Sequence, residues 1–182
     1  MSAKKFWNVI DTDKAFAGNW IDINLDKVKL PDDSVIEFEA ICFHRNGAGV
    51  IAENTKGEVI LVKNYRYIND YYSWEVPAGT IPPGMHHSDC VIEELKEEAG
   101  CEAVKDNMIY WGNFYPSIGS GNQMFHCYYA KNTVQTTSEL DENEILEAKW
   151  FSKKEIISMI KEGIIKDGFS LYLLFRWLYL PD

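Results

Sequence analysis

Alternating apolar and polar residues run through the first part of the chain and predict β-strands there. "WIDINLDKVKL" (20–30) and "VIEFEAICF" (35–43) both alternate with the period of a half-buried strand. The intervening "PDDS" is rich in turn-forming residues, so the two segments are predicted to form an N-terminal β-hairpin. A second hairpin is predicted where "GVIAE" (49–53) and "VILVKNYR" (59–66) flank "NTKG". β-Branched apolar residues dominate 59–66, which favours a central position for that strand.

Shorter strand signals follow in the middle of the chain. "SWEVPAG" (73–79) predicts a short strand that Pro77 and Gly79 end, because both residues weaken a strand interior. "TIPPGMHH" comes next, and its Pro-Pro-Gly content predicts a loop. Further along, strands are predicted at about 108–115 and 124–130.

A helix is predicted between these strands, at residues 88–99. Its apolar positions recur at helical spacing and form one stripe. Ser88 or Asp89 can cap the first turn, and Gly100 can end the helix in the left-handed conformation. The opposite face of the helix is strongly acidic.

The C-terminal part of the chain is predicted to end in two helices. "TVQTTSELDENEILE" is a polar, acidic loop that leads to "AKWF". Ser152 and Glu155 have the spacing of a capping box, which predicts a helix to about Lys161. A last helix is predicted from about Phe169 to Leu180. Since it is apolar nearly all round, it should pack against the sheet or a partner subunit.

Length and composition limit the kinds of protein that fit this pattern. The 182 residues and the mixture of strands and helices predict an α/β sandwich with a mixed sheet, in one domain over 1–182. The formal net charge of −10 disfavours nucleic acid as a partner, because such a surface repels phosphates. The longest apolar run, "LYLLFRWLYL", has ten residues and contains an arginine, so no membrane span is expected.

The cysteine pattern points to a reducing compartment. Four cysteines are present, and none forms a C-x-x-C pair. Their spacing predicts neither a zinc site nor a disulfide framework. We therefore expect free thiols and a cytoplasmic protein.

Carboxylates gather on one face of the predicted 88–99 helix. Glu94 lies three residues before Glu97 and four before Glu98, which places the side chains next to each other. Like charges at these spacings destabilise a helix unless something compensates. The face is either a solvated acidic surface or a site for a hard divalent cation such as Mg²⁺ or Mn²⁺.

The stretch "EVPAGTIPPGMHHSDCVIEELKEEAGC" resembles the Nudix box of the Nudix hydrolases, G-x5-E-x7-R-E-U-x-E-E-x-G-U, where U is apolar. The positions in register are Gly79, Glu94, Leu95, Glu97, Glu98, Gly100 and Cys101. The flanking "LVKNYRY", "YPSIGSGNQMFHCYYA" and "DENEILEAKWFSKKE" resemble the ADP-ribose pyrophosphatase branch of that family. The resemblance covers most of the chain from about Trp20 onward, and it implies a Nudix-type α/β/α sandwich.

Two positions of the box differ in this chain. Met85 stands where the family has its first glutamate, and Glu93 stands where the family has arginine. In the family these two residues are thought to pair and hold the helix and the loop in place. Because both partners are replaced, no lone buried charge remains, which is the costly outcome. The change puts the rigidity of the loop, and therefore the rate, in question.

The resemblance implies a metal-dependent hydrolase of a nucleoside diphosphate linked to another group, with Mg²⁺ or Mn²⁺ bound by the acidic helix. Glu94 and Glu98 would be the main metal ligands, with Glu98 also catalytic, and Glu97 and the Ala78 carbonyl would support them. The branch takes its general base from an acidic loop, which matches "DENE" here.

Residues outside the helix are assigned by the same resemblance. Glu142 would be the base that deprotonates or orients water, and Glu144 a further metal ligand; alternatively, the segment is a solvated acidic loop. Arg66 could bind a phosphate through two N–H groups, or it could be a surface arginine. Glu75 could touch the substrate or organise the strand end.

Several other side chains are left between two interpretations. The aromatic residues Trp20, Tyr65, Tyr67 and Trp74 could stack on a base, or they could be core and interface residues. His86 and His87, beside Met85, could replace one of the missing contacts, but they are expected to be exposed loop residues. The neutral Asn122 and Gln123 lie where the branch often has an acidic residue, so substrate contacts could differ there.

Two functions of different classes remain. The first is Mg²⁺-dependent hydrolysis of ADP-ribose or a related nucleoside diphosphate sugar, giving AMP and a sugar phosphate. The second is a nucleotide-binding module of the same fold with weak or lost catalysis, which Met85 and Glu93 favour. The branch commonly forms homodimers through its N-terminal strands, so residues 1–45 are a possible dimerisation element.

Overall fold

The computed structural model describes residues 6–138, 140 and 144–180. The chain separates into an N-terminal unit, Met1–Asn46 with Ser117–Gln123, and a larger unit, Gly47–Pro116 with Met124–Asp182. The single domain predicted over 1–182, and the role of 1–45 in dimerisation, stay predictions.

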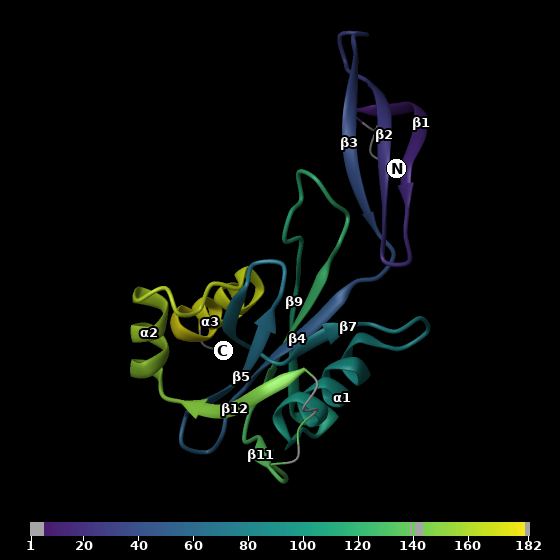
Figure 1. The fold of residues 1–182 in the computed structure, drawn as a ribbon. Coiled ribbons are helices and arrows are strands. Elements are labelled where there is room, and N and C mark those ends of the chain that lie inside the picture. The colour runs from purple at the N-terminus through teal and green to yellow at the C-terminus, as the bar shows by residue number, and fades with distance from the viewer. Residues whose placement is uncertain (1–5, 139, 141–143, 181–182) are drawn as a thin grey trace. The chain divides into compact units, whose positions relative to one another are not determined.

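The N-terminal unit is built on an antiparallel sheet with the order β1-β2-β3 (Figure 1). Its strands are β1 (Asn8–Ala17), β2 (Ile21–Lys29) and β3 (Val35–Phe43). The β2–β3 pairing confirms the predicted N-terminal hairpin. The sequence pattern did not predict β1. All ten of its residues are exposed, so no buried face imposes an alternation of apolar and polar residues.

The segment 117–123 packs on β3 within the same unit. Gly121 forms a parallel bridge with Ile41. The Asn122 side chain accepts the Phe43 N–H at 2.6 Å and donates its amide to the Phe43 carbonyl at 3.4 Å. Asn122 is therefore used to hold this loop on the strand.

The larger unit contains a four-stranded, a three-stranded and a two-stranded sheet. The four-stranded sheet has the order β7-β4-β10-β9, and its strands are β4 (Gly47–Ala52), β7 (Ala78–Thr80), β9 (Met108–Phe114) and β10 (Phe125–Ala130). The three-stranded sheet has the order β12-β5-β6, and its strands are β5 (Val59–Arg66), β6 (Tyr71–Glu75) and β12 (Ile145–Phe151). The two-stranded sheet pairs β8 (Cys101–Glu102) with β11 (Val134–Gln135). The β4–β10 pair is parallel, so the four-stranded sheet is mixed.

Three sequence predictions are wrong in this unit. The predicted hairpin of 49–53 with 59–66 does not form as a ladder, because β4 and β5 pair with strands of different sheets and share one isolated bridge. The predicted strand 73–79 is two strands, and it divides at Pro77, which has no N–H for a ladder. The acidic loop is shorter than predicted, since β12 already begins at Ile145, which is buried.

Helices cover both sides of these strands (Figure 1). α1 (His87–Ala99) lies on one side, and α2 (Lys153–Lys161) and α3 (Gly168–Tyr179) lie on the other. A short 3₁₀ turn, η1 (Lys105–Asn107), precedes β9. The arrangement confirms the predicted α/β/α sandwich.

The helix ends match the sequence signals with one exception. Gly100 ends α1 in the left-handed conformation, with φ of 61°, as predicted. Ser152 and Glu155 form the predicted capping box of α2. The cap of α1, however, is the His86 side chain, which accepts the Ser88 N–H at 3.3 Å, and not Ser88 or Asp89.

Two hydrophobic clusters fill the larger unit. One lies under α2 and α3, and includes Leu61, Ile156 and Leu173. The other lies under α1, and includes Val62 and Leu95. Because adjacent residues of β5 belong to different clusters, both faces of this strand are buried, which confirms its central position.

No helix among the described residues is long and apolar enough to cross a membrane.

Candidate active site

The acidic face of α1 is turned partly into the protein. Glu98 has only 7% of its surface exposed, and its Oε2 accepts the Ala78 N–H at 2.9 Å. Glu94 is half-buried, and Glu97 is exposed. The fold therefore brings Glu94 and Glu98 to the start of β7 and leaves Glu97 at the surface.

Burial and mutual repulsion change the ionisation of these carboxylates. Burial, together with the charges of Glu97, Glu144 and Glu93, raises the pKa of Glu94 to about 7. Burial raises the pKa of Glu98 to about 8, although the Ala78 N–H acts in the opposite direction. A cation bound there would therefore stabilise the ionised form of both carboxylates.

Gly79 allows Glu94 to reach β7. A Cβ atom at position 79 would lie 1.7 Å from Glu94 Oε1, so any larger residue would overlap with the carboxylate. Glycine is therefore needed at this position of the Nudix box because a carboxylate approaches the backbone closely.

Gly79→Ala is expected to lower the turnover rate by about a hundredfold without unfolding the protein, since a displaced catalytic group typically loses this much. The overlap is with the end of a flexible side chain, so Glu94 can swing away and the backbone need not move. Thermal unfolding and steady-state kinetics of the variant would test this. Gly119→Ala, at an exposed loop position with open space around it and no positive φ, reports the effect of a glycine substitution outside the site. A Gly79→Ala protein with unchanged turnover would contradict the placement of Glu94.

An ion pair lies beside the carboxylates. The Arg66 guanidinium donates from Nε to Glu75 Oε1 at 2.9 Å and from Nη2 to Glu75 Oε2. Glu75 is buried, whereas 56% of the Arg66 side chain is exposed. Glu75 is therefore a buried anchor for Arg66, and the remaining guanidinium N–H groups are available to an anion.

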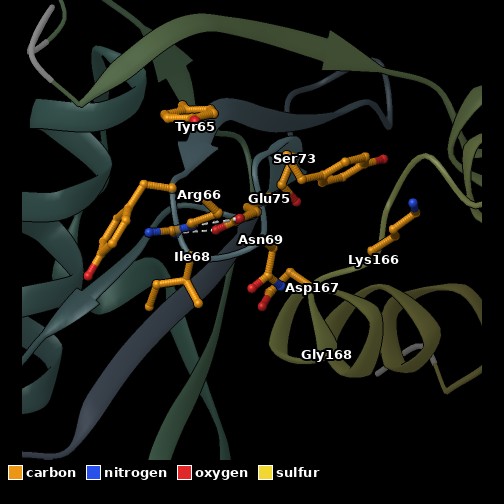
Figure 2. Close-up of a pocket in the computed structure, with 11 residues that line it drawn as sticks. Tyr65, Arg66, Ile68, Asn69, Ser73, Glu75, Lys166, Asp167 and Gly168 are labelled. Carbon is orange, nitrogen blue, oxygen red and sulfur yellow. Dashed lines mark hydrogen bonds and ion pairs between the residues drawn. The ribbon is translucent and has the colours of Figure 1, made fainter.

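Arg66 and Glu75 line a pocket of about 500 Å³ between the β5–β6 turn and the first turn of α3 (Figure 2). The other lining residues are Tyr65, Tyr67, Ile68, Asn69, Tyr71, Ser73, Lys166, Asp167 and Gly168. Sequence reasoning did not identify Ser73, Lys166 or Asp167 as site residues. The β5–β6 pairing and the start of α3 bring them together across about ninety residues of sequence.

Some of the four aromatic residues lie where they could stack on a base, and the others do not line the pocket. Tyr65 and Tyr67 line the pocket. Trp74 packs against Phe151 in the core, with ring centroids 4.9 Å apart. Trp20 belongs to the N-terminal unit, is 62% exposed, and carries the Arg45 guanidinium over its ring.

The two residues of the acidic loop have different outcomes. Glu144 is exposed, and its charge contributes to the raised pKa of Glu94, so it lies within electrostatic range of the site. Glu142 lies outside the described residues. Its role as a base stays a prediction.

The donor set fits a hydrated divalent cation. Among the residues that the structure describes, no three His, Cys, Asp or Glu side chains converge closely enough to hold a metal alone. Mg²⁺ usually keeps several waters and binds through one or two carboxylates together with substrate phosphates. Glu94 and Glu98 meet that requirement, and a bound cation would offset the effect of the burial that raises their pKa values.

Other contacts hold the start of α1, where this chain has Met85 and Glu93. Lys105 pairs with Asp89 in the first turn of the helix. The His87 ring stacks on the His126 ring, with centroids 4.0 Å apart and planes 8° apart, and its Nδ1 contacts the Tyr128 hydroxyl. The His87 contacts attach the helix to β10, and the Lys105–Asp89 pair attaches it to η1. Together they provide an alternative to the family's ion pair.

The expectation that His87 is an exposed loop residue is therefore wrong, while His86 is exposed as expected. Burial and the neighbouring His126 and His86 lower the pKa of His87 to about 4, so the ring is neutral at pH 7. In the sequence, the only available indication of these contacts was that His126 and Tyr128 lie two residues apart on a strand and so share one face. It could not reveal which helix lies over that face.

Comparisons with known proteins give the family and the fold of this chain. A model of the NUDIX domain matches residues 43–171. The ADP-ribose pyrophosphatase of Bacillus subtilis is 27% identical over 95% of this chain and 92% of its own length. The methanol dehydrogenase activator of Bacillus methanolicus is 29% identical over 87% of this chain and 85% of its own length.

A solved structure of an ADP compounds hydrolase has the same fold, with a TM-score of 0.82 and 15% identity over 98% of this chain and 97% of the other. The family model covers more than half of the chain and includes the acidic helix, the Arg66–Glu75 pair and the start of α3. The chain belongs to the Nudix hydrolase family.

Proposed function

We propose that this protein hydrolyses the pyrophosphate of ADP-ribose or a related nucleoside diphosphate sugar, with Mg²⁺ or Mn²⁺ as cofactor, and releases AMP and a sugar phosphate. The substrate class is supported by similarity to the ADP-ribose pyrophosphatase of Bacillus subtilis. The methanol dehydrogenase activator is similar over nearly as much of the chain, so the proposal depends on the site itself.

One observation carries the proposal. Glu94 and Glu98 are withdrawn from solvent on one helix face and have raised pKa values, and a free arginine edge lies next to them at Arg66. A protein gains nothing in stability from two buried, mutually repelling carboxylates unless a cation joins them. A cation that lies between these carboxylates and the phosphates of a substrate bound at Arg66 would neutralise the negative charge of both groups.

The residues of the chain then have separate roles. Glu94 and Glu98 would hold the metal, assisted by Glu97, Glu144 and the Ala78 carbonyl. When bound, the metal lowers the pKa of water and neutralises the phosphates. Arg66, oriented by Glu75, would bind phosphate oxygens through its free N–H groups.

A base is still needed to orient or deprotonate the attacking water. Glu142 is our candidate by its position in the "DENE" segment. This role rests on the sequence resemblance alone.

The alternative is a nucleotide-binding module with weak catalysis, and Met85 and Glu93 favour it. The Lys105–Asp89 pair and the His87 contacts support the enzyme instead, because the start of α1 is held without the missing pair.

We further propose a cytoplasmic protein, supported by free thiols at all four cysteines, and a homodimer formed through the N-terminal strands.

The experiment that tests the function is AMP or GMP release from ADP-ribose, ADP-glucose and GDP-mannose, with Mg²⁺ and with a chelator. We expect metal-dependent release from at least one substrate, with most activity above pH 7, where Glu94 and Glu98 ionise. Tight, metal-dependent binding of ADP-ribose without release of any product would favour the binding module.

A further inference from the structure

The chain passes from one sheet to another between two groups of the candidate site. β6 ends at Glu75, the buried anchor of Arg66, and β7 begins at Ala78, whose carbonyl is a proposed metal ligand. Because β6 belongs to the three-stranded sheet and β7 to the four-stranded sheet, only Val76 and Pro77 join the two strands. The conformation of these two residues therefore sets the position of Ala78 relative to Arg66.

The pairing of β7 with β4 determines where the backbone groups of Ala78 point. The Val50 N–H donates to the Pro77 carbonyl at 3.1 Å, and the next pair along the ladder is Gly49 with Ala78. Hydrogen-bonded and non-hydrogen-bonded pairs alternate along an antiparallel ladder, so the N–H and the carbonyl of Ala78 point away from β4. Both groups therefore lie at the outer edge of β7, where the N–H is bonded to Glu98 Oε2 at 2.9 Å.

Ser170, in the first turn of α3, holds the two joining residues. The start of α3 and the end of β6 meet at one pocket, which Asp167 and Glu75 line (Figure 2). Ser170 is fully buried, and its Oγ accepts the N–H of Val76, which lies 94 residues earlier in the chain, at 3.0 Å. The same Oγ donates to Asp167 Oδ2 at 2.7 Å. Since an ionised carboxylate only accepts, the hydroxyl proton points at Asp167 and a lone pair of Oγ is left for Val76.

The bond from Val76 to Ser170 has no substitute in the backbone. Pro77 has no N–H, so Val76 carries the only backbone donor between the two strands. Val76 is buried, and a buried N–H that loses its acceptor costs free energy. The side chain of Ser170 is therefore the group that fixes this donor, and with it the direction in which β7 begins.

We propose that Ser170 is a positioning residue for the metal site: by fixing Val76, it holds the Ala78 carbonyl at the edge of β7 that faces Glu98. This inference rests on the proposed function, in which that carbonyl and Glu98 are metal ligands. Because Ser170 is fully buried, it acts through the backbone and does not itself contact a ligand.

The other end of the crossing is held independently of Ser170. Glu75 pairs with Val62 in the β5–β6 ladder, and its carboxylate is bonded to the Arg66 guanidinium. Loss of the Ser170 hydroxyl should therefore disturb the metal ligands and leave the phosphate-binding arginine in place.

The test is Ser170→Ala, beginning with amide hydrogen exchange of the metal-free protein. The Val76 N–H loses its acceptor directly, so faster exchange there reports only the substitution. The Ala78 N–H keeps Glu98 as its acceptor, and its exchange should accelerate about tenfold relative to amides in the middle of β5, because its position is no longer fixed. The amides of β5 report any loss of global stability.

Metal binding and kinetics of the same variant give the second readout. Titration calorimetry with Mn²⁺ and no substrate should show an affinity about tenfold lower, as for one weakened contact. For ADP-ribose, kcat should fall about tenfold while KM stays within about twofold. A merely structural serine would lower the melting temperature and leave Ala78 exchange, Mn²⁺ affinity and kcat unchanged.

Ser152→Ala is the matched control. Ser152 also begins a helix, but its Oγ is bonded to the N–H and the carboxylate of Glu155, within α2. This variant should lower the melting temperature without an effect on Ala78 exchange or Mn²⁺ affinity. If Ser170→Ala prevents folding, Ser170→Cys takes its place, since a thiol accepts hydrogen bonds only weakly.

The positioning role is overturned by wild-type exchange at Ala78, by an unchanged Mn²⁺ affinity, or by equal losses in the Ser152→Ala control. It is also overturned if the wild-type protein binds no Mn²⁺. The proposed function fails separately, if the wild-type protein binds Mn²⁺ and releases no AMP. In such a protein, Ser170-dependent Mn²⁺ affinity and Ala78 exchange would leave the positioning role standing without the hydrolase.

Discussion

Replacing Glu98 by glutamine is expected to reduce AMP release by about 10³-fold while the protein stays folded. A metal ligand contributes several kcal/mol of transition-state stabilisation, and about 4 kcal/mol corresponds roughly to this factor. Glutamine keeps the size of the side chain and an oxygen that can accept the Ala78 N–H. Only the charge that we propose binds the cation is lost.

Stability should change in the opposite direction from activity. The pKa of Glu98 is raised from 4.5 to about 8, so the folded protein favours the neutral acid. Its contribution to stability is fully present below pH 4.5 and is lost as the pH rises through about 8. Glutamine mimics the neutral acid, so the chelator-treated variant should melt above the wild type at pH 8 and close to it at pH 5.

Glu94→Gln should have the same two effects, with the stability difference appearing nearer pH 7. Glu93→Gln on the same helix is the control, because Glu93 is exposed and its neutralisation should leave turnover within about twofold. Kinetics and thermal melts at pH 5 and pH 8, with chelator and with Mg²⁺, test the predicted effects of these variants on turnover and on stability. Full activity in the Glu98→Gln protein would exclude the metal site on α1.

Arg66→Ala is expected to weaken both the substrate complex and the fold. Loss of a charge-assisted contact to phosphate should raise KM for ADP-ribose roughly tenfold to a hundredfold. The same change leaves the Glu75 carboxylate buried without its partner, which should lower the free energy of unfolding by about 1–3 kcal/mol. Since Arg66 is more than half exposed, the lower part of that range is expected.

A second substitution separates the two effects. Glu75→Gln in the Arg66→Ala background removes the unpaired charge, so stability should recover while KM stays high. Urea unfolding and steady-state kinetics of both proteins, with Lys56→Ala as an exposed control in the β4–β5 turn, make the comparison. If KM recovers together with stability, Arg66 acts through the fold and does not bind phosphate.

Local sequence patterns were sufficient for the elements whose stability is local. α1 and its end at Gly100, and the capping box of α2, depend on contacts a few residues apart, so their spacing predicted them. The acidic face of α1 was predicted for the same reason, because helix geometry alone places Glu94 beside Glu98.

Strand pairing was predicted less well, because it depends on distant partners. The turn 54–57 is present, as its backbone bonds show, but β4 pairs with β10 and β5 pairs with β12, about eighty residues away. β1 was missed because pairing with β2 alone stabilises it and leaves no periodic apolar face.

By itself the sequence determined the family, the acidic helix and the carboxylates proposed to bind the metal, since a short motif with strict spacing carries all three. Only the tertiary structure decided that Glu98 is buried and Glu97 is not, that Glu75 anchors Arg66, that His87 stacks on His126, and that Ser73 and Asp167 line one pocket. The physical reason is that burial, ionisation and hydrogen-bond pairing depend on which distant segments pack together. Spacing along the chain does not contain that information.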